Sequence, residues 1–305
     1  MQLFFILISF TFQAHLVNTN AELTSAITNS TSGTTITLAK GTWTNVQISI
    51  QKTGTASNLI ILKAQTAGSV FFQGNSYIKI GGEYVYIEGV VFQNPSGLTV
   101  SSSTITPVIT FKASTECKNC KVTNVNIDSY NGTSSQSTST FKWILLYGEY
   151  NEISYCSFLG KYGLGSIIND NRDTSTPHYS KIHHNYFGGR TPVIEVNVLN
   201  DQDAIGIGNS ATSLLPSYTE VYDNYFYNFS GEIEVISNKS RNNKYYYNSF
   251  RDYQGCLKLR HVDNCEVFNN FFIANNKLFS GGIWIIGENH NAYNNYIEGV
   301  NSKKI

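Results

Sequence analysis

The chain has 305 residues, enough for one large all-β domain or two ordinary domains with a substantial core. Charged residues make up 14% of the chain and balance to a net charge of zero, which argues against a global basic field for nucleic acid or a membrane surface. Tyrosine (20) and phenylalanine (18) are abundant, and Asn and Thr recur throughout, so strands and polar turns are favoured over helices.

The N-terminus opens with an apolar run from Leu3 to Phe12 and then turns polar. This run is too short to span a bilayer and is typical of a secretion signal, although no Lys or Arg precedes it. We therefore expect a signal peptide over residues 1–20, with a buried first strand as the alternative. Secretion as a glycoprotein fits four Asn-x-Ser/Thr triplets, at Asn29, Asn131, Asn228 and Asn238.

Five cysteines are scattered along the chain, which is an odd number. Cys117 and Cys120 have the C-x-x-C spacing of metal ligands, but no second pair or nearby His completes a zinc site. We expect core cysteines or a local pair.

A short motif that ends in an aromatic or aliphatic residue recurs along the chain. It reads VVF at Val90, VNI at Val125, CSF at Cys156, NYF at Asn185 and Asn224, NSF at Asn248, NFF at Asn270 and NYI at Asn295. The last three intervals are 24, 22 and 25 residues, and periods in the twenties indicate a solenoid of stacked units.

Within each unit the runs are short and β-rich, with Gly and Asn at the corners and no sustained helical period. Leucine-rich repeats have this length, but their leucines at fixed offsets are absent. The repeat predicts an all-β, single-domain parallel β-helix over residues 21–305. The recurring asparagines are expected to form a structural ladder along the stack, not to bind ligands.

The stretch GEIEVISNKS places Glu232 and Glu234 two residues apart in an apolar run. Residues two apart on a strand share a face, about 7 Å from each other, within reach of one ion. Lys239 follows, and Arg260 comes about one coil later, so Arg260 is expected roughly 5 Å away on the next rung. The preceding coil is expected to bring Asn200 beside the glutamates.

These residues could be solvated surface charges, but they are embedded in apolar strands of a charge-poor chain. Oxygen ligands from an amide and two carboxylates suit a hard cation such as calcium. A metal beside a lysine and an arginine suits proton abstraction next to a carboxylate, because the cations stabilise the developing negative charge while the amine removes the proton.

From Ala21 to Val300 the sequence resembles polysaccharide lyase family 6, which includes chondroitinase B and many alginate lyases. The stretches that carry the resemblance are LAKGTWTN, HHNYFGGR, GEIEVISNKS, LKLRH and GENHNAYNNYIEG. The resemblance implies a right-handed parallel β-helix that cleaves uronic-acid polysaccharides by β-elimination. It implies Lys239 as the base and Arg260 at the position assigned as the acid.

The same resemblance implies Asn200, Glu232 and Glu234 as calcium ligands, and Arg190 and His261 as residues that line the substrate cleft. Because a guanidinium hardly ever gives up its proton, we expect Arg260 to stabilise negative charge, with water or another side chain protonating the leaving oxygen.

The sequence departs from the family at two arginine positions, which hold Gly206 and Trp284. Their loss predicts weaker binding of an acidic chain, with a sugar ring stacking on Trp284 instead. The chain also stops at Ile305 after a complete rung, where the family's domain normally continues. The C-terminal end of the helix is thus expected to be uncapped or the sequence to be incomplete.

The sequence therefore predicts a secreted, monomeric lyase that uses calcium and acts on an acidic polysaccharide, with alginate favoured over chondroitin or dermatan sulfate on the family's base rate. Neither nucleic acid nor a membrane is expected as a partner. Two alternatives remain, a non-catalytic β-helix that binds acidic glycans and a glycoside hydrolase with paired carboxylates across a glycosidic bond.

Overall fold

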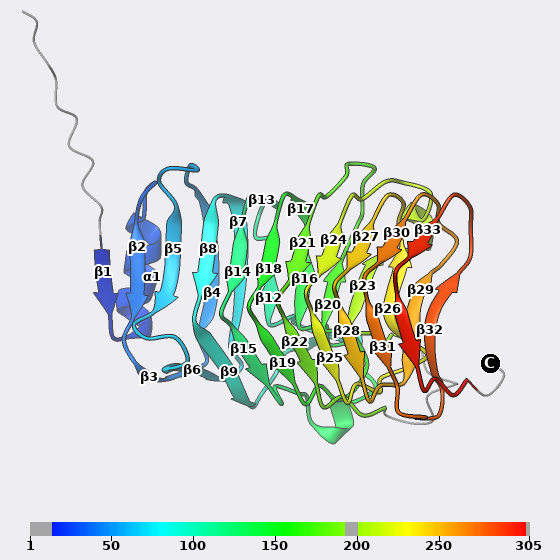
Figure 1. Cartoon of the computed structure of the whole chain (residues 1–305). Coiled ribbons are helices and arrows are strands. Elements are labelled where there is room, and N and C mark those ends of the chain that lie inside the picture. The colour runs from blue at the N-terminus through cyan, green and yellow to red at the C-terminus, as the bar shows by residue number, and fades with distance from the viewer. Residues whose placement is uncertain (1–13, 193–200, 303–305) are drawn as a thin grey trace, which may run out of the picture.

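The computed structural model describes residues 14–192 and 201–302, and these form a parallel β-helix (Figure 1). Each full coil runs through three strands in the same order, and equivalent strands of successive coils pair in parallel to build three long sheets. We call these sheets A, B and C, and one coil a rung. The all-β solenoid expected from the repeat is confirmed.

The strands of the three sheets have the following bounds. Sheet A contains β1 (Ala14–Val17), β2 (Thr35–Leu38), β5 (Ile60–Ala64), β8 (Val85–Glu88), β14 (Lys121–Thr123), β18 (Glu152–Ser154), β21 (Lys181–His183), β24 (Glu220–Tyr222), β27 (Lys244–Tyr246), β30 (Glu266–Phe268) and β33 (Asn291–Tyr293). Sheet B contains β3 (Gly41–Thr44), β6 (Val70–Gly74), β9 (Val90–Pro95), β15 (Asn126–Asp128), β19 (Ser157–Leu159), β22 (Tyr186–Gly188), β25 (Tyr225–Tyr227), β28 (Ser249–Arg251), β31 (Phe271–Ile273) and β34 (Tyr296–Glu298). Sheet C contains β4 (Gln47–Thr53), β7 (Tyr77–Glu83), β12 (Ile109–Thr110), β13 (Cys117–Lys118), β16 (Ile144–Leu146), β17 (Gly148–Glu149), β20 (Ile168–Asp170), β23 (Ile205–Gly208), β26 (Glu234–Lys239), β29 (Gly255–Leu259) and β32 (Ser280–Ile285).

The corner between sheets A and B is built the same way on seven successive rungs, from β14 to β34. Two residues separate the strands, and the first has a left-handed backbone, as at His184 (φ 54°) and Asn269 (φ 57°). On five of these rungs the second residue is an asparagine. The Asn224 side chain donates to Oδ1 of Asn248 at 3.0 Å, and Asn248 donates to Oδ1 of Asn270 at 3.0 Å. The expected asparagine ladder is therefore confirmed.

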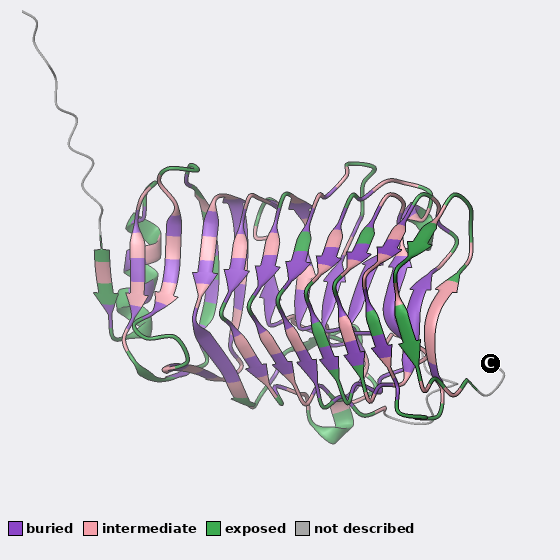
Figure 2. Ribbon diagram, in the orientation of Figure 1, coloured by how far each residue is buried: buried purple, intermediate pink, exposed green. Residues whose placement is uncertain are grey.

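The core fills the interior of the coils with stacked apolar side chains. Figure 2 shows buried residues alternating with more exposed ones along most of the strands. One aromatic column runs inside sheet B, where ring centroids lie 4.5 to 5.1 Å apart from Phe158 through Phe187, Phe226 and Phe250 to Phe272. These are the aromatic ends of the sequence motif, because in-register parallel pairing places equivalent residues directly above one another.

The connections from sheet B to sheet C differ in length from rung to rung. The shortest lie between β3 and β4 (Asn45 and Val46) and between β6 and β7 (Asn75 and Ser76), whereas the connection after β9 contains a hairpin of β10 (Val100–Ser101) and β11 (Thr104–Ile105). The connection after β15 carries a short 3₁₀ helix, η1 (Ser134–Gln136). A second 3₁₀ helix, η3 (Ser210–Thr212), lies after β23, in a connection from sheet C back to sheet A. The chain therefore varies its loops while equivalent strands keep pairing in parallel.

One α-helix, α1 (Asn20–Asn29), was not expected from the sequence. Thr19 caps it by accepting a hydrogen bond from the Glu22 amide, and the helix buries Leu23 and Ala26 against the first rung. The preceding strand β1 pairs with β2, so residues 14–17 of the expected signal segment lie in sheet A. Residues 1–13 lie outside the described residues, and the leader stays a prediction.

All five cysteines are buried and free, which agrees with the core alternative. No helix among the described residues is long and apolar enough to cross a membrane.

Candidate functional site

The predicted catalytic residues lie on sheet C, near the end of the described solenoid. Gly206 of β23 pairs with Ser237 of β26, and Ser237 pairs with Lys258 of β29. Lys258 pairs in turn with Trp284 of β32. The neighbouring apolar positions, such as Ile205, Ile236 and Leu257, point into the core and are fully buried. Because side chains alternate along a strand, Gly206, Ser237, Lys258 and Trp284 form one outward column.

Lys239 and Arg260 occupy a second outward column, two residues further along the strands. Gly208 pairs with Lys239, and the Arg260 amide donates to the Asn238 carbonyl oxygen at 2.9 Å. Arg260 therefore follows Lys239 on the adjacent rung, as the spacing of 21 residues predicts. Among the described residues Lys239 forms no ion pair within 4.0 Å, so nothing there holds its amine back from a ligand.

A cleft of about 370 Å³ opens beside Lys239. Its lining includes two lysines, two aspartates and two glycines: Lys142, Lys239, Asp201, Asp203, Gly206 and Gly208. Gly206 and Gly208 add no side chains to the wall of the cleft, and Gly206 has little room for one. A Cβ atom there would lie 2.7 Å from Asp203 Oδ2 and 2.9 Å from Asn169 Nδ2. Glycine at this departure from the family therefore fits its local packing.

The carboxyl group of Asp203, which lines the cleft, and those of Glu232 and Glu234 are buried and affect one another electrostatically. Burial, with Asp203 and Glu234 nearby, raises the pKa of Glu232 to about 8. Burial and the charge of Asp201 raise the pKa of Asp203 to about 7. Sequence reasoning missed Asp203, because no spacing rule places a residue of a connecting loop beside the two glutamates.

Two of the three expected calcium ligands, Glu232 and Glu234, have hydrogen-bonding or charged partners of their own. Oε1 of Glu232 accepts a hydrogen bond from the Gln202 amide at 2.7 Å. Oε1 of Glu234 lies 2.9 Å from Lys258 Nζ and 3.4 Å from an Arg260 guanidinium nitrogen. Asn200 lies outside the described residues, and among those described no group of three His, Cys, Asp or Glu side chains could hold a metal. As they stand, these two glutamates do not fit a calcium site.

The two residues expected to line the substrate cleft differ in exposure. Arg190 is fully buried, and its guanidinium donates to the carbonyl oxygens of Gly163, Gly165 and Asp203 at 2.8, 3.0 and 3.2 Å. The expectation that Arg190 lines the cleft is therefore wrong, since its hydrogen-bonding groups hold loop backbone instead. His261 is exposed next to Arg260, just past the end of β29.

Lys258 is a residue of the site that sequence reasoning did not single out. Its side chain is 8% exposed, and its ammonium lies 3.8 Å from the centre of the Trp284 ring as well as beside Glu234. The only available signal was the alternation in CLKLRH, which puts Lys258 on the same face as Arg260.

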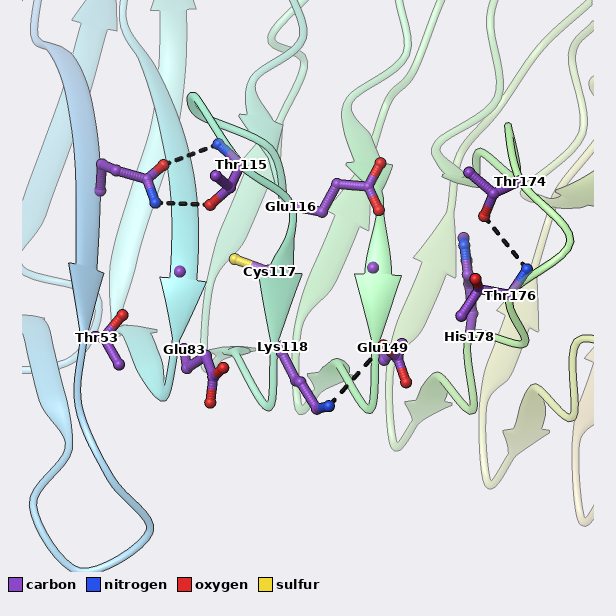
Figure 3. Close-up of a pocket in the computed structure, with 13 residues that line it drawn as sticks. Thr53, Glu83, Thr115, Glu116, Cys117, Lys118, Glu149, Thr174, Thr176 and His178 are labelled. Atoms are coloured by element: carbon purple, nitrogen blue, oxygen red, sulfur yellow. Dashed lines mark hydrogen bonds and ion pairs between the residues drawn. The ribbon is translucent and has the colours of Figure 1, made fainter.

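Sheet C carries a second hollow, of about 560 Å³, several rungs toward the N-terminus (Figure 3). Glu83, Lys118 and Glu149 stand in register along it, and Lys118 lies 3.9 Å from Glu149. The hollow shares no lining residue with the cleft beside Lys239.

The comparisons with known proteins agree with this architecture. The family model described as Chondroitinase B matches residues 17–305. A solved structure of the alginate lyase AlyGC of polysaccharide lyase family 6 is 31% identical, with a TM-score of 0.86 over 94% of this chain and 38% of that one. No curated protein matches the chain.

Two further solved structures of the same family are similar. A mannuronic acid-specific family 6 lyase from human gut microbiota is 27% identical, with a TM-score of 0.85 over 94% of this chain and 65% of that one. The lyase Pedsa3628 from Pseudopedobacter saltans is 26% identical, with a TM-score of 0.81 over 94% and 64%. The chain thus spans between 38% and 65% of the length of these structures. With the family model matched over nearly its whole length, the chain belongs to the chondroitinase B family, polysaccharide lyase family 6.

Proposed function

We propose that this chain cleaves a uronic-acid polysaccharide by β-elimination, with alginate as the favoured substrate. The observation that carries the proposal is that Lys239, which lines an open cleft, is followed by Arg260 on the adjacent rung. Membership of a lyase family supports the reaction class, and the solved relatives named as alginate lyases support the substrate.

In the proposed reaction the amine of Lys239 takes the proton from the sugar carbon next to the carboxylate. The electron pair forms a carbon–carbon double bond as the neighbouring glycosidic carbon–oxygen bond breaks, and water protonates the leaving oxygen. Arg260, whose side chain is 36% exposed, stabilises the negative charge that the substrate carboxylate gains in the enolate-like transition state. A guanidinium that keeps its proton is suited to this role and not to that of an acid.

No step of this proposal passes through calcium, because Oε1 of Glu234 already has two cationic partners. A hydrolase would need two carboxyl groups roughly 5–10 Å apart across the scissile bond. Glu232 and Glu234 are buried at 3% and 2% exposure, so they do not face a substrate from opposite sides.

A product assay on a panel of uronate polysaccharides tests the proposal. Elimination creates an unsaturated uronate with new ultraviolet absorbance, and alginate is expected to give the largest signal. New reducing ends without that absorbance would identify a hydrolase. Binding to the polysaccharides with no new product would identify a glycan-binding β-helix and refute the lyase.

We also propose that the protein is secreted as a monomer, since a uronic-acid polysaccharide is encountered outside the cell. Of the predicted glycosylation sites, Asn29 is exposed, whereas Asn238 is fully buried and hydrogen-bonded to Asn243 and Ser240. Glycan mapping of the secreted protein is therefore expected to find Asn29 modified and Asn238 unmodified.

A further inference from the structure

The buried side of the site contains a lysine where the sequence leads one to expect a metal ion. Lys258 projects from β29 between Ser237 and Trp284 of the adjacent rungs, with 8% of its side chain exposed. A charged ammonium in this setting needs compensation, because transferring it from water is costly. Glu234, 3% exposed and 2.9 Å away, provides the compensating charge.

The surroundings of Glu234 are already positive. Its one carboxylate faces both the Lys258 ammonium and the Arg260 guanidinium, at 2.9 and 3.4 Å. A divalent ion that approached Glu234 would meet two like charges at short range, and repulsion in a buried setting is only weakly screened. Lys258 therefore fills the electrostatic role of a cation at this carboxylate.

Trp284 completes the arrangement from the next rung. The Lys258 ammonium lies 3.8 Å from the ring centre, within the range at which an aromatic face attracts a cation. An arginine at position 284, which the family resemblance leads one to expect, would place another positive charge beside Lys258. The two features fit together, because the indole stabilises the buried lysine that an arginine would repel. This face of Trp284 is thus occupied by Lys258 and not free for a sugar ring.

We infer that Lys258 is the resident cation of this site and that it replaces calcium at Glu234. Lys258 is a positioning residue, which neither takes nor gives a proton in the reaction. Its charge balances Glu234, so that the more exposed Arg260 keeps its positive charge available for the substrate carboxylate. The inference rests on the proposed function for its kinetic consequence, but its prediction about metal binding is independent of activity.

The test compares the unmodified protein with Lys258→Met, which keeps the length of the side chain and removes the charge. Calorimetric titration with calcium chloride is expected to show no site at Glu234 in the unmodified protein and a new site in Lys258→Met, with affinity in the micromolar to millimolar range. The double variant Lys258→Met/Glu234→Gln should lose that new site. Circular dichroism and thermal unfolding check that each variant is folded.

In the product assay the unmodified protein is expected to keep its rate in excess chelator. Lys258→Met should have a kcat about 100-fold lower in chelator and recover part of it with calcium, while Lys258→Arg should retain most of the activity. Loss of the unmodified protein's activity in chelator with recovery in calcium would overturn the inference, and so would a calcium site that Glu234→Gln removes. If no polysaccharide gives a product, the proposed function fails, but the calorimetry still decides the role of Lys258.

Discussion

The corner between sheets A and B and the outward face of sheet C follow opposite rules. At the corner, asparagine repeats from rung to rung, and each side-chain oxygen accepts hydrogen bonds from both the backbone and the side-chain amide of the asparagine on the preceding rung. On the outward column of sheet C the residues change at every rung, from Gly206 through Ser237 and Lys258 to Trp284. Repetition of asparagine at the corner stabilises the stack. Variation of the outward residues of sheet C creates a site with its own chemistry.

The largest effect is expected from removing Lys239, the side chain that we propose acts in catalysis and that contributes little to stability. Lys239→Ala should lower kcat by about 100-fold or more while leaving the free energy of unfolding nearly unchanged, since Lys239 forms no ion pair with the described residues. The control is Lys244→Ala on sheet A, which removes an exposed lysine paired with Glu266. A Lys239→Ala variant with more than a few per cent of the original rate would exclude Lys239 as the base.

The converse change breaks the repeated position. The Asn248 side chain accepts two hydrogen bonds from Asn224 and donates to the Val221 carbonyl oxygen and to Asn270. Asn248→Ala should lower the free energy of unfolding by about 3 kcal/mol, because it leaves several buried groups unpaired. Urea unfolding measures this loss, with the exposed Asn291→Ala as the control. Equal stability of the two variants would show that the ladder is not what holds the corner.

Gly206 tests whether the variable column tolerates the residue that the family resemblance leads one to expect. From the sequence, arginine at this position should tighten binding of an acidic chain. The structure adds a steric cost, because even a Cβ atom meets Asp203 and Asn169. Gly206→Arg should lower the free energy of unfolding by about 1–3 kcal/mol, measured by thermal unfolding beside Gly206→Ala. Unchanged stability together with tighter binding of oligouronates would show that Asp203 and Asn169 move aside.

A smaller effect is expected from a non-repeated pair inside the helix. His178 contacts Asp170, which is fully buried on β20. Burial alone would lower the pKa of His178, but the charge of Asp170 outweighs it and raises this pKa. The pair therefore stabilises the fold fully below the ordinary histidine pKa of about 6.5, and the stabilisation is lost as the pH rises through the raised value.

Urea unfolding of the unmodified protein and of His178→Gln is compared from about pH 6 to about pH 9. The difference in their free energies of unfolding should shrink as the pH rises. A difference that stays constant with pH would mean that His178 is not protonated in the folded protein.

The sequence predicts the repeated part of this molecule well and the site only in part. The asparagine ladder and the phenylalanine column follow from spacing, because stacking converts a period into contact. The placement of Lys239 beside Arg260 follows in the same way. Glu234 does not, since the register between β26 and β29 shifts between Glu234 and Ile236. Glu232 in turn precedes β26, which begins at Glu234, so the two glutamates do not share a strand.

Other features could not be found from spacing at all. The burial of Arg190 depends on loops that fold over it, and α1 is short, with only Leu23 and Ala26 facing the core. The contact between Lys258 and Trp284 also could not be predicted, because the sequence does not show that the lysine ammonium lies over the indole ring.

The uneven connections between sheets B and C have a consequence for how such a protein can evolve. The hairpin β10–β11 lies between β9 and β12 and the helix η1 between β15 and β16, and these flanking strands still pair in parallel with their neighbours. A lineage can therefore lengthen, shorten or exchange these connections as interchangeable parts. The scaffold and the substrate preference of a β-helix can in this way diversify at different rates within one gene.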